Sequence, residues 1–247
     1  MCFLIDWPVN CPIMVQMLLL AADTSSPSGS VAILREDSVV GLIHTVSDEP
    51  YSSRLFRHID FLLRDLSLEL KDFDLFAVAS GPGSFTGLRV GLTAAKAWSE
   101  AFNLPVAGVS VLEAVASEAG AGPSLRIPVV DARRQEVYYA LFDGNGNQQA
   151  LAGNECVAAM DELVADVRSR AGGRRITFVA SCPELLASVA ESFGRETAEY
   201  ELVSSALAPS IGRIAMSLAR AGHLADSLTL DANYVRRSDA ELKWKGQ

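Results

Sequence analysis

The chain has 247 residues, so either one large domain or two small lobes would fit. Hydrophobic residues make up 49% and charged residues 21%, which excludes a disordered tail, a collagen and a coiled coil. Lys and Arg number 21 against 30 Asp and Glu, giving a net charge of −9. A chain this acidic is not expected to hold nucleic acid by its overall field.

Residues 1–16 are expected to be an extension outside the fold. Asp6, Pro8, Asn10 and Pro12 interrupt an apolar stretch that has no basic start and no small-residue cleavage site, so it makes a poor signal peptide. No run of 18 apolar residues occurs, so no membrane span is predicted. The four cysteines form no CxxC pair, and a reducing cytoplasm fits them.

Residues 17–118 are predicted to form a first α/β lobe. Three apolar runs separated by polar turns indicate an antiparallel meander, and apolar residues at helical spacing follow it. In chain order, we predict strands at Met17–Ala22, Ser30–Leu34 and Val39–Val46, a helix at Tyr51–Leu70, a strand at Leu75–Ala79, a Gly-rich loop at Gly81–Gly87, a helix at Leu88–Phe102 and a strand at Val106–Val109.

Residues 119–235 are predicted to repeat this plan in a second, reduced lobe. A Gly, Ala and Pro stretch at Ala119–Pro123 marks the junction. Asp131 ends an apolar run as Asp23 does, 108 residues earlier. The repeat indicates an α/β fold of two duplicated, ribonuclease-H-like lobes, and a mixed basic tail is expected at 236–247. The further predicted elements are strands at Ile127–Val130, Val137–Phe142 and Ile176–Ala180 and helices at Ala158–Arg170, Pro183–Phe193 and Pro209–Ala221, the last of which could pack back on the first lobe.

The Gly-rich loop at Gly81–Gly87 allows two interpretations. Backbone N–H groups at the start of a helix form a natural anion site. Leu88 follows Gly87 where a P-loop needs Lys, and Thr86 stands where a nucleophile elbow needs Gly. Alternatively, the loop is a tight strand-to-helix connection with Ser84 or Thr86 as the helix cap.

The following helix carries a stripe of small residues, Gly87, Gly91 and Ala95, four apart. Gly inside a helix costs about 1 kcal/mol relative to Ala, so something is expected to pack closely against the stripe. Either the helix's own lobe or another chain could do so. We predict a partner interface on the two first-lobe helices, formed by Leu55, Ile59, Leu62, Gly87, Gly91 and Ala95.

Five segments together resemble the bacterial TsaB (YeaZ) family, and the resemblance extends from Met17 to Lys245. They are Leu18–Thr24 (LLLAADT), Gly81–Gly91 (GPGSFTGLRVG), Val106–Leu112 (VAGVSVL), Val129–Tyr138 (VVDARRQEVY) and Tyr234–Arg237 (YVRR). The resemblance implies the two-lobed actin-like ATPase fold. It also implies a role in forming N6-threonylcarbamoyladenosine on the adenosine 3′ of the anticodon, in tRNAs that read codons starting with A.

The resemblance further implies a non-catalytic subunit. The partners would be the transferase TsaD and the ATPase TsaE, with tRNA reached only through that complex. Alone, the chain would pair with itself, through the same helices. The alternative from the residues is a stand-alone ATPase or small-molecule kinase of this fold. A metallopeptidase needs metal ligands, and His44, His58 and His223 have no helical spacing that would supply them.

In actin-like ATPases, an Asp at each such strand end lies near the phosphates of a nucleotide held between the lobes. The turn after Asp131, Ala132–Gln135, has no glycine, so a complete ATP site is not expected. The aspartates are expected to accept backbone N–H bonds in their turns instead. No cofactor of its own is predicted, although ATP or ADP could lie at an interface with TsaD. The set predicted as a vestigial nucleotide site is Asp23, Thr24, Gly81, Gly83, Ser84 and Asp131.

Overall fold

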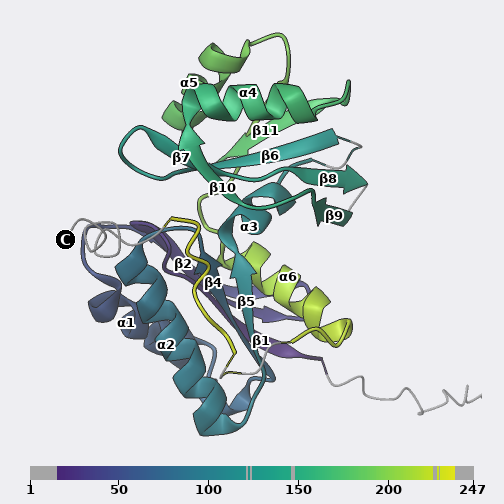
Figure 1. Ribbon diagram of the computed structural model, residues 1–247. Coiled ribbons are helices and arrows are strands. Elements are labelled where there is room, and N and C mark those ends of the chain that lie inside the picture. Colours follow the sequence, from purple (N-terminus) through teal and green to yellow (C-terminus); the bar gives the residue numbers. More distant parts are fainter. Residues whose placement is uncertain are drawn as a thin grey trace, which may run out of the picture.

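The computed structural model describes residues 16–236 except 121, 123, 146, 147, 225, 226 and 228. Two α/β lobes lie one above the other, joined through the helices between them (Figure 1). Of the expected N-terminal extension only Gln16 is described, and of the expected tail only Arg236, so both predictions otherwise lie outside the described residues.

The first lobe is built on a sheet of five strands in the order β3-β2-β1-β4-β5. The meander predicted from the apolar runs is confirmed, because β2 pairs antiparallel with both β1 and β3. The strands β4 and β5 then extend the sheet in parallel to β1. The strands are β1 (Leu18–Asp23), β2 (Ser28–Arg35), β3 (Ser38–Val46), β4 (Leu75–Gly81) and β5 (Val106–Ser110).

Helices α1 (Tyr51–Asp65) and α2 (Phe85–Phe102) pack side by side on this sheet (Figure 1). The helix predicted to reach Leu70 ends at Asp65. Ser67 adopts a left-handed backbone (φ 54°), and the N–H of Leu68 bonds to Leu63 O at 2.8 Å. The apolar pattern continues past Asp65 because the leucines that follow it still pack on the core. A short 3-10 helix, Leu70–Asp72, comes next.

The second lobe repeats the same sheet. Its main strands follow the order β10-β7-β6-β11-β12, with the same antiparallel and parallel pairings as the first. The prediction of a reduced second lobe is wrong for the sheet, because the described residues add a hairpin and bring it to seven strands. The strands are β6 (Ser124–Asp131), β7 (Glu136–Tyr139), β8 (Phe142–Asn145), β9 (Gln148–Leu151), β10 (Cys156–Ala159), β11 (Ile176–Ala180) and β12 (Glu199–Leu202).

The hairpin explains another difference from the sequence prediction. The single strand predicted at Val137–Phe142 is two strands, β7 and β8, interrupted at Ala140 and Leu141. Both pair with β6, β7 near its carboxyl end and β8 near its start. The helices α4 (Met160–Arg170) and α5 (Pro183–Phe193) cover this lobe, and α4 begins two residues later than predicted because Cys156–Ala159 forms strand β10.

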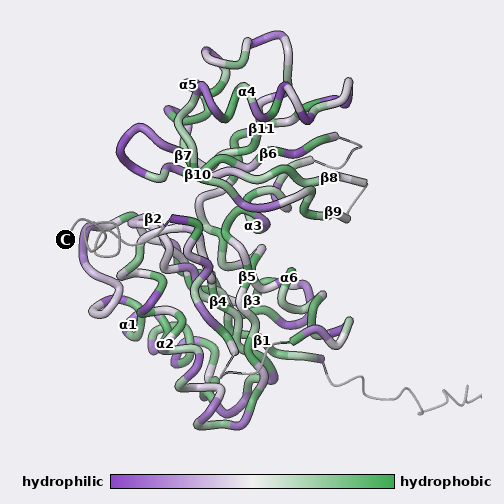
Figure 2. The backbone as a smooth tube through the Cα atoms, viewed as in Figure 1, coloured by the Kyte–Doolittle hydropathy of each residue, from purple (hydrophilic) through white to green (hydrophobic). Residues whose placement is uncertain are grey.

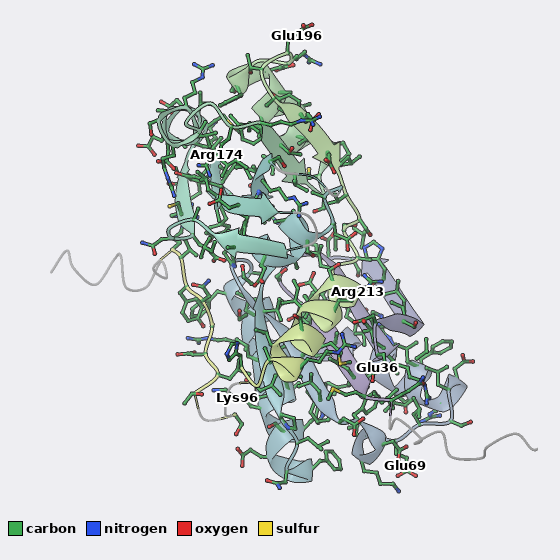
Figure 3. The ribbon with its side chains drawn as sticks, turned by 90° about the vertical axis from the view of Figure 1, so that its right-hand side faces the viewer. Glu36, Glu69, Lys96, Arg174, Glu196 and Arg213 are labelled. Carbon is green, nitrogen blue, oxygen red and sulfur yellow. The ribbon has the colours of Figure 1, made fainter. Side chains whose placement is uncertain are left out.

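Two helices connect the lobes. The short helix α3 (Val111–Ser117), which the sequence reading missed, packs on β6 of the second lobe. Helix α6 (Ala208–Arg220) returns to the first lobe, where Ile211 and Met216 join its core against β1 and β2. Figure 3 shows Arg213 of α6 on the same side of this lobe as Glu36, which lies in the β2–β3 turn and, like Asp37 beside it, pairs with Arg220.

The central strands are apolar in both lobes, whereas the helices alternate hydrophilic and hydrophobic residues along their length (Figure 2). In the described part of the chain, no helix is both long enough and apolar enough to cross a bilayer.

Candidate functional site

Asp23, at the carboxyl end of β1, is fully buried. Its Oδ1 accepts the backbone N–H of Ser25 at 2.9 Å, while Oδ2 has no hydrogen-bond partner within the described residues. Burial raises the pKa of this carboxyl, and the hydrogen bonds from Ser25 oppose the shift only in part. The predicted turn-capping role of Asp23 is confirmed.

Asp131 holds the equivalent position in the second lobe but lies in a different environment. Its Oδ1 accepts the N–H of Arg133 at 2.8 Å, which confirms the same turn-capping role, yet its side chain is 58% exposed. The next residues, Arg133, Arg134 and Gln135, all have φ near +60°. This left-handed run turns β6 into β7 without a glycine.

The Gly-rich connection packs directly against the β1–β2 turn. The N–H of Ser84 donates to Ser25 O at 2.7 Å, and the Ser84 hydroxyl accepts the N–H of Gly87 at 3.3 Å. Ser84 is therefore the N-cap of α2, which confirms the second interpretation of the loop. A Cβ on Gly83 would lie 2.6 Å from Ser25 O, so this glycine admits a neighbouring backbone.

These contacts show which groups of the predicted vestigial nucleotide site are free to bind a phosphate. Phosphates are held by unengaged backbone N–H groups and a cation-binding carboxylate. Here the N–H groups of Ser84 and Gly87 already have acceptors, and the Asp23 carboxyl is buried. These three groups are therefore not free to hold a phosphate or its cation.

The six residues predicted to form a partner interface are buried inside the first lobe. Leu55, Ile59 and Leu62 of α1 are 0–4% exposed and belong to the core of the first lobe. The small stripe of α2 also faces inward, because a Cβ on Gly87 would run into the carbonyl oxygen of Thr24. Ala95 is 2% exposed. These six residues position the helices on their own sheet and are not available to a partner.

A cavity of about 260 Å³ lies where the β1–β2 turn meets the amino ends of α1 and α2. Thr24, Ser84 and Gly87 line it, but Asp131 does not. The cavity is therefore confined to the first lobe and does not bring the two strand-end aspartates together.

Arg54 and Tyr51, which sequence reasoning missed, also line this cavity. Arg54 is 1% exposed, stacks 3.9 Å over the Tyr51 ring, and donates to Pro27 O (2.8 Å) and Thr45 Oγ1 (2.9 Å). Burial, followed by the nearby Asp23 charge, raises the pKa of Tyr51 to about 12. The signal that could have identified Arg54 is its place on the apolar face of α1, directly beside Leu55.

The histidines are dispersed. His44 Nε2 contacts the hydroxyls of Ser28 and Ser205, at 2.9 and 3.2 Å. Burial, together with Arg54 and Arg57, lowers the pKa of His58. Across the described ranges, no three His, Cys, Asp or Glu side chains form a group that could hold a metal ion.

Known proteins match this chain over most of its length. Residues 35–237 match the family model described as "TsaD: tRNA N6-adenosine threonylcarbamoyltransferase". The "tRNA threonylcarbamoyladenosine biosynthesis protein TsaB" of Bacillus subtilis (strain 168) is 30% identical over 229 residues, which cover 92% of this chain and 98% of that protein.

Solved structures share the fold. "YeaZ from Pseudomonas aeruginosa" superposes with a TM-score of 0.73 at 24% identity, covering 88% of this chain and 99% of that one. The "Activator of the 2-Hydroxyisocaproyl-CoA Dehydratase from Clostridium difficile with bound ADPNP" has a TM-score of 0.52 at 10% identity, covering 83% and 97%. The predicted duplicated fold is thus confirmed, and the chain belongs to the TsaB family, also called YeaZ.

Proposed function

We propose that this chain is an accessory subunit in the formation of N6-threonylcarbamoyladenosine on tRNA, and that it binds and activates the transferase TsaD together with TsaE. The observation that carries the proposal is the similarity to the Bacillus subtilis TsaB, which spans almost the whole of both chains. The chain itself would not catalyse the transfer, and tRNA would be reached through the complex.

The environments of the strand-end aspartates support the non-catalytic role. A residue that holds a phosphate-bound cation must present its charge to the ligand, whereas Asp23 is buried beneath its own turn. The equivalent Asp131 is exposed and engaged with Arg133. The two carboxylates thus have unlike surroundings, which disfavours the alternative of a stand-alone ATPase or kinase.

The partner surface is proposed on the outer side of α1 and α2, in place of the buried stripe. Along α2, the half-exposed Val90 and the exposed Thr93, Ala97 and Ala101 follow helical spacing and face outward. From α1, Phe56 is 52% exposed and contacts the Trp98 ring edge-on, with centroids 6.2 Å apart. We call Phe56, Val90, Ala97 and Ala101 the outer face.

Small side chains beside one aromatic anchor suit a close helix-to-helix contact. Such a contact needs about 1,600 Å² of buried surface in total to be stable. TsaD, which has the same fold, is the proposed occupant of the outer face, and a second copy of this chain would take its place when TsaD is absent.

Reconstitution tests the function. The chain, TsaD and TsaE would be purified separately, mixed in all combinations with tRNA, threonylcarbamoyl-AMP and ATP, and assayed for the modified nucleoside. We expect modification when all three proteins are present, little without this chain, and no ATP turnover by this chain alone. Robust turnover by the isolated chain, abolished by Asp23→Ala, would overturn the accessory role in favour of the ATPase alternative.

A further inference from the structure

The segment that follows α6 crosses from the first lobe to the second. Leu230–Arg236, which we call the strap, runs along the first lobe toward the other lobe (Figure 1). Leu230 is 5% exposed, and its Cδ1 lies 2.5 Å from the position that a Cβ on Gly108 of β5 would take. The Tyr234 ring packs against Phe85 with centroids 5.0 Å apart and a 32° tilt, and its hydroxyl accepts a hydrogen bond from Arg89 Nε at 3.1 Å.

Asn233 connects the two lobes at the middle of the strap. Its backbone N–H donates to Ser80 O, at the end of β4, at 2.7 Å. Its side-chain Nδ2 donates at 2.6 Å to Glu155, which lies just before β10 of the second lobe. The same Glu155 carboxylate accepts the hydroxyl of Ser110, at the end of β5, so one residue of the strap joins a polar network drawn from both lobes.

Arg236 anchors the far end of the strap to the second lobe. Its Nη1 donates to Ala132 O at 2.7 Å, and its Nη2 forms an ion pair with Glu136. Its guanidinium also lies 5.8 Å from the centre of the Tyr138 ring. Arg236 thus closes the left-handed turn after Asp131, which has no glycine of its own to stabilise it.

These contacts place the strap at the carboxyl ends of the central strands in both sheets. In open α/β sheets, ligands bind outside this edge. Gly81, the last residue of β4, has φ +126°, and a Cβ there would lie 2.6 Å from Asn233 O. The end of β4 is therefore shaped to admit the backbone of the strap.

We propose that the strap is a built-in occupant of the inter-lobe site and a clasp that fixes the angle between the lobes. The chain's own backbone and the Asn233 and Arg236 side chains supply contacts across the lobes that a ligand would otherwise supply. The lobes are held together without a nucleotide, and none enters while the strap is in place. This inference does not depend on the proposed role in tRNA modification.

Two spin labels and hydrogen exchange test the proposal on the full chain. Asp65 of α1, on the side away from the outer face, and Ser188 of α5, both exposed, would be changed to cysteine for labelling after the four native cysteines are changed to serine. The compared proteins would be the unsubstituted labelled chain, Asn233→Ala/Arg236→Ala, the milder Arg236→Ala alone, and Arg213→Ala as a control. Among the residues that the structure describes, Arg213 donates to Asp37 O alone, within the first lobe, at 3.4 Å.

We expect a narrow distance distribution for the unsubstituted labelled chain and for Arg213→Ala, unchanged by MgATP. In the strap variants, the distribution should broaden and the backbone amide at position 233 should exchange about tenfold faster or more. If either strap variant folds and keeps the narrow distribution, the strap is not the clasp. If MgATP alters the exchange of Leu230–Arg236 in the unsubstituted chain, the site is open to nucleotide and the proposal is overturned.

Discussion

A Cβ placed on Gly91 would lie 2.5 Å from the hydroxyl oxygen of Thr24, so helix α2 approaches the β1–β2 turn more closely than any side chain allows. The Thr24 hydroxyl donates to Gly87 O at 2.8 Å, which ties the turn to the same stripe of the helix. The glycines that look like a dimerisation motif in the sequence are thus the contact between a helix and its own sheet.

Gly91→Leu should therefore destabilise the isolated protein. Overpacking costs about 1–3 kcal/mol, and a chain of this size loses about 2–4 °C in Tm for each kcal/mol. The control is Ala187→Leu, which adds methyl groups to the exposed side of helix α5 in the second lobe. Thermal unfolding of both variants checks the prediction, and an unchanged Tm for Gly91→Leu would contradict the inward orientation of the stripe.

The buried Asp23 predicts a pH-dependent effect of substitution. Because burial raises its pKa, the folded state binds the proton more tightly than the unfolded chain. The stability linked to that proton is fully present below the ordinary pKa of 3.8 and is lost as pH rises through the raised pKa. Asp23→Asn stays neutral, so its Tm relative to the unsubstituted protein should rise from acidic to neutral pH.

The control for this pH series is Asp131→Asn. Asp131 holds the same place at a strand end but is exposed, and an asparagine oxygen can still accept the N–H of Arg133. The Tm of this exposed variant, relative to the unsubstituted protein, should change less over the same pH range than that of Asp23→Asn. Parallel pH profiles for the two variants would rule out burial of Asp23 as the cause.

Arg54 should be important for the stability of the first lobe. Arg54→Ala removes the guanidinium's hydrogen bonds to Pro27 O and Thr45 Oγ1 and its packing over Tyr51, and a lost buried partner costs about 1–3 kcal/mol. Arg57→Ala on the same helix removes only an exposed pair with Glu49 and should leave Tm nearly unchanged. Chemical denaturation of the two variants gives the comparison, and equal losses would contradict a special role for the buried guanidinium.

The proposed outer face makes a separate prediction about binding. Ala97→Arg should weaken TsaD binding at least tenfold, equivalent to about 1.4 kcal/mol, because a charge would be buried without a partner. Phe61→Arg introduces the same charge on the other flank of α1, five residues and about 140° of helical rotation from Phe56, and should bind normally. Titration calorimetry with both variants tests this, and equal affinities would exclude the outer face.

Apolar periodicity is enough to predict the alternation of strands and helices, because it reports which residues must leave water. It also showed the duplication, through two apolar runs that each end in Asp. The predicted ends of helices differ from the structure where apolar residues outside a helix also pack on the core. Leu68 kept the apolar pattern after α1 had ended, and α3 was too short to show a period of its own.

Which faces are buried, and which distant segments lie together, follows from how the sheets and helices pack in three dimensions. Gly87 and Gly91 could have faced a partner or their own lobe, because a stripe of small residues shows only that something comes close. Asp23 and Asp131 look alike in the sequence, yet packing buries one and leaves the other in solvent. Asn233 and Glu155 are 78 residues apart, and the fold alone brings them to 2.6 Å. Periodicity encodes the burial of each segment, whereas contacts between distant segments depend on how the sheets and helices pack.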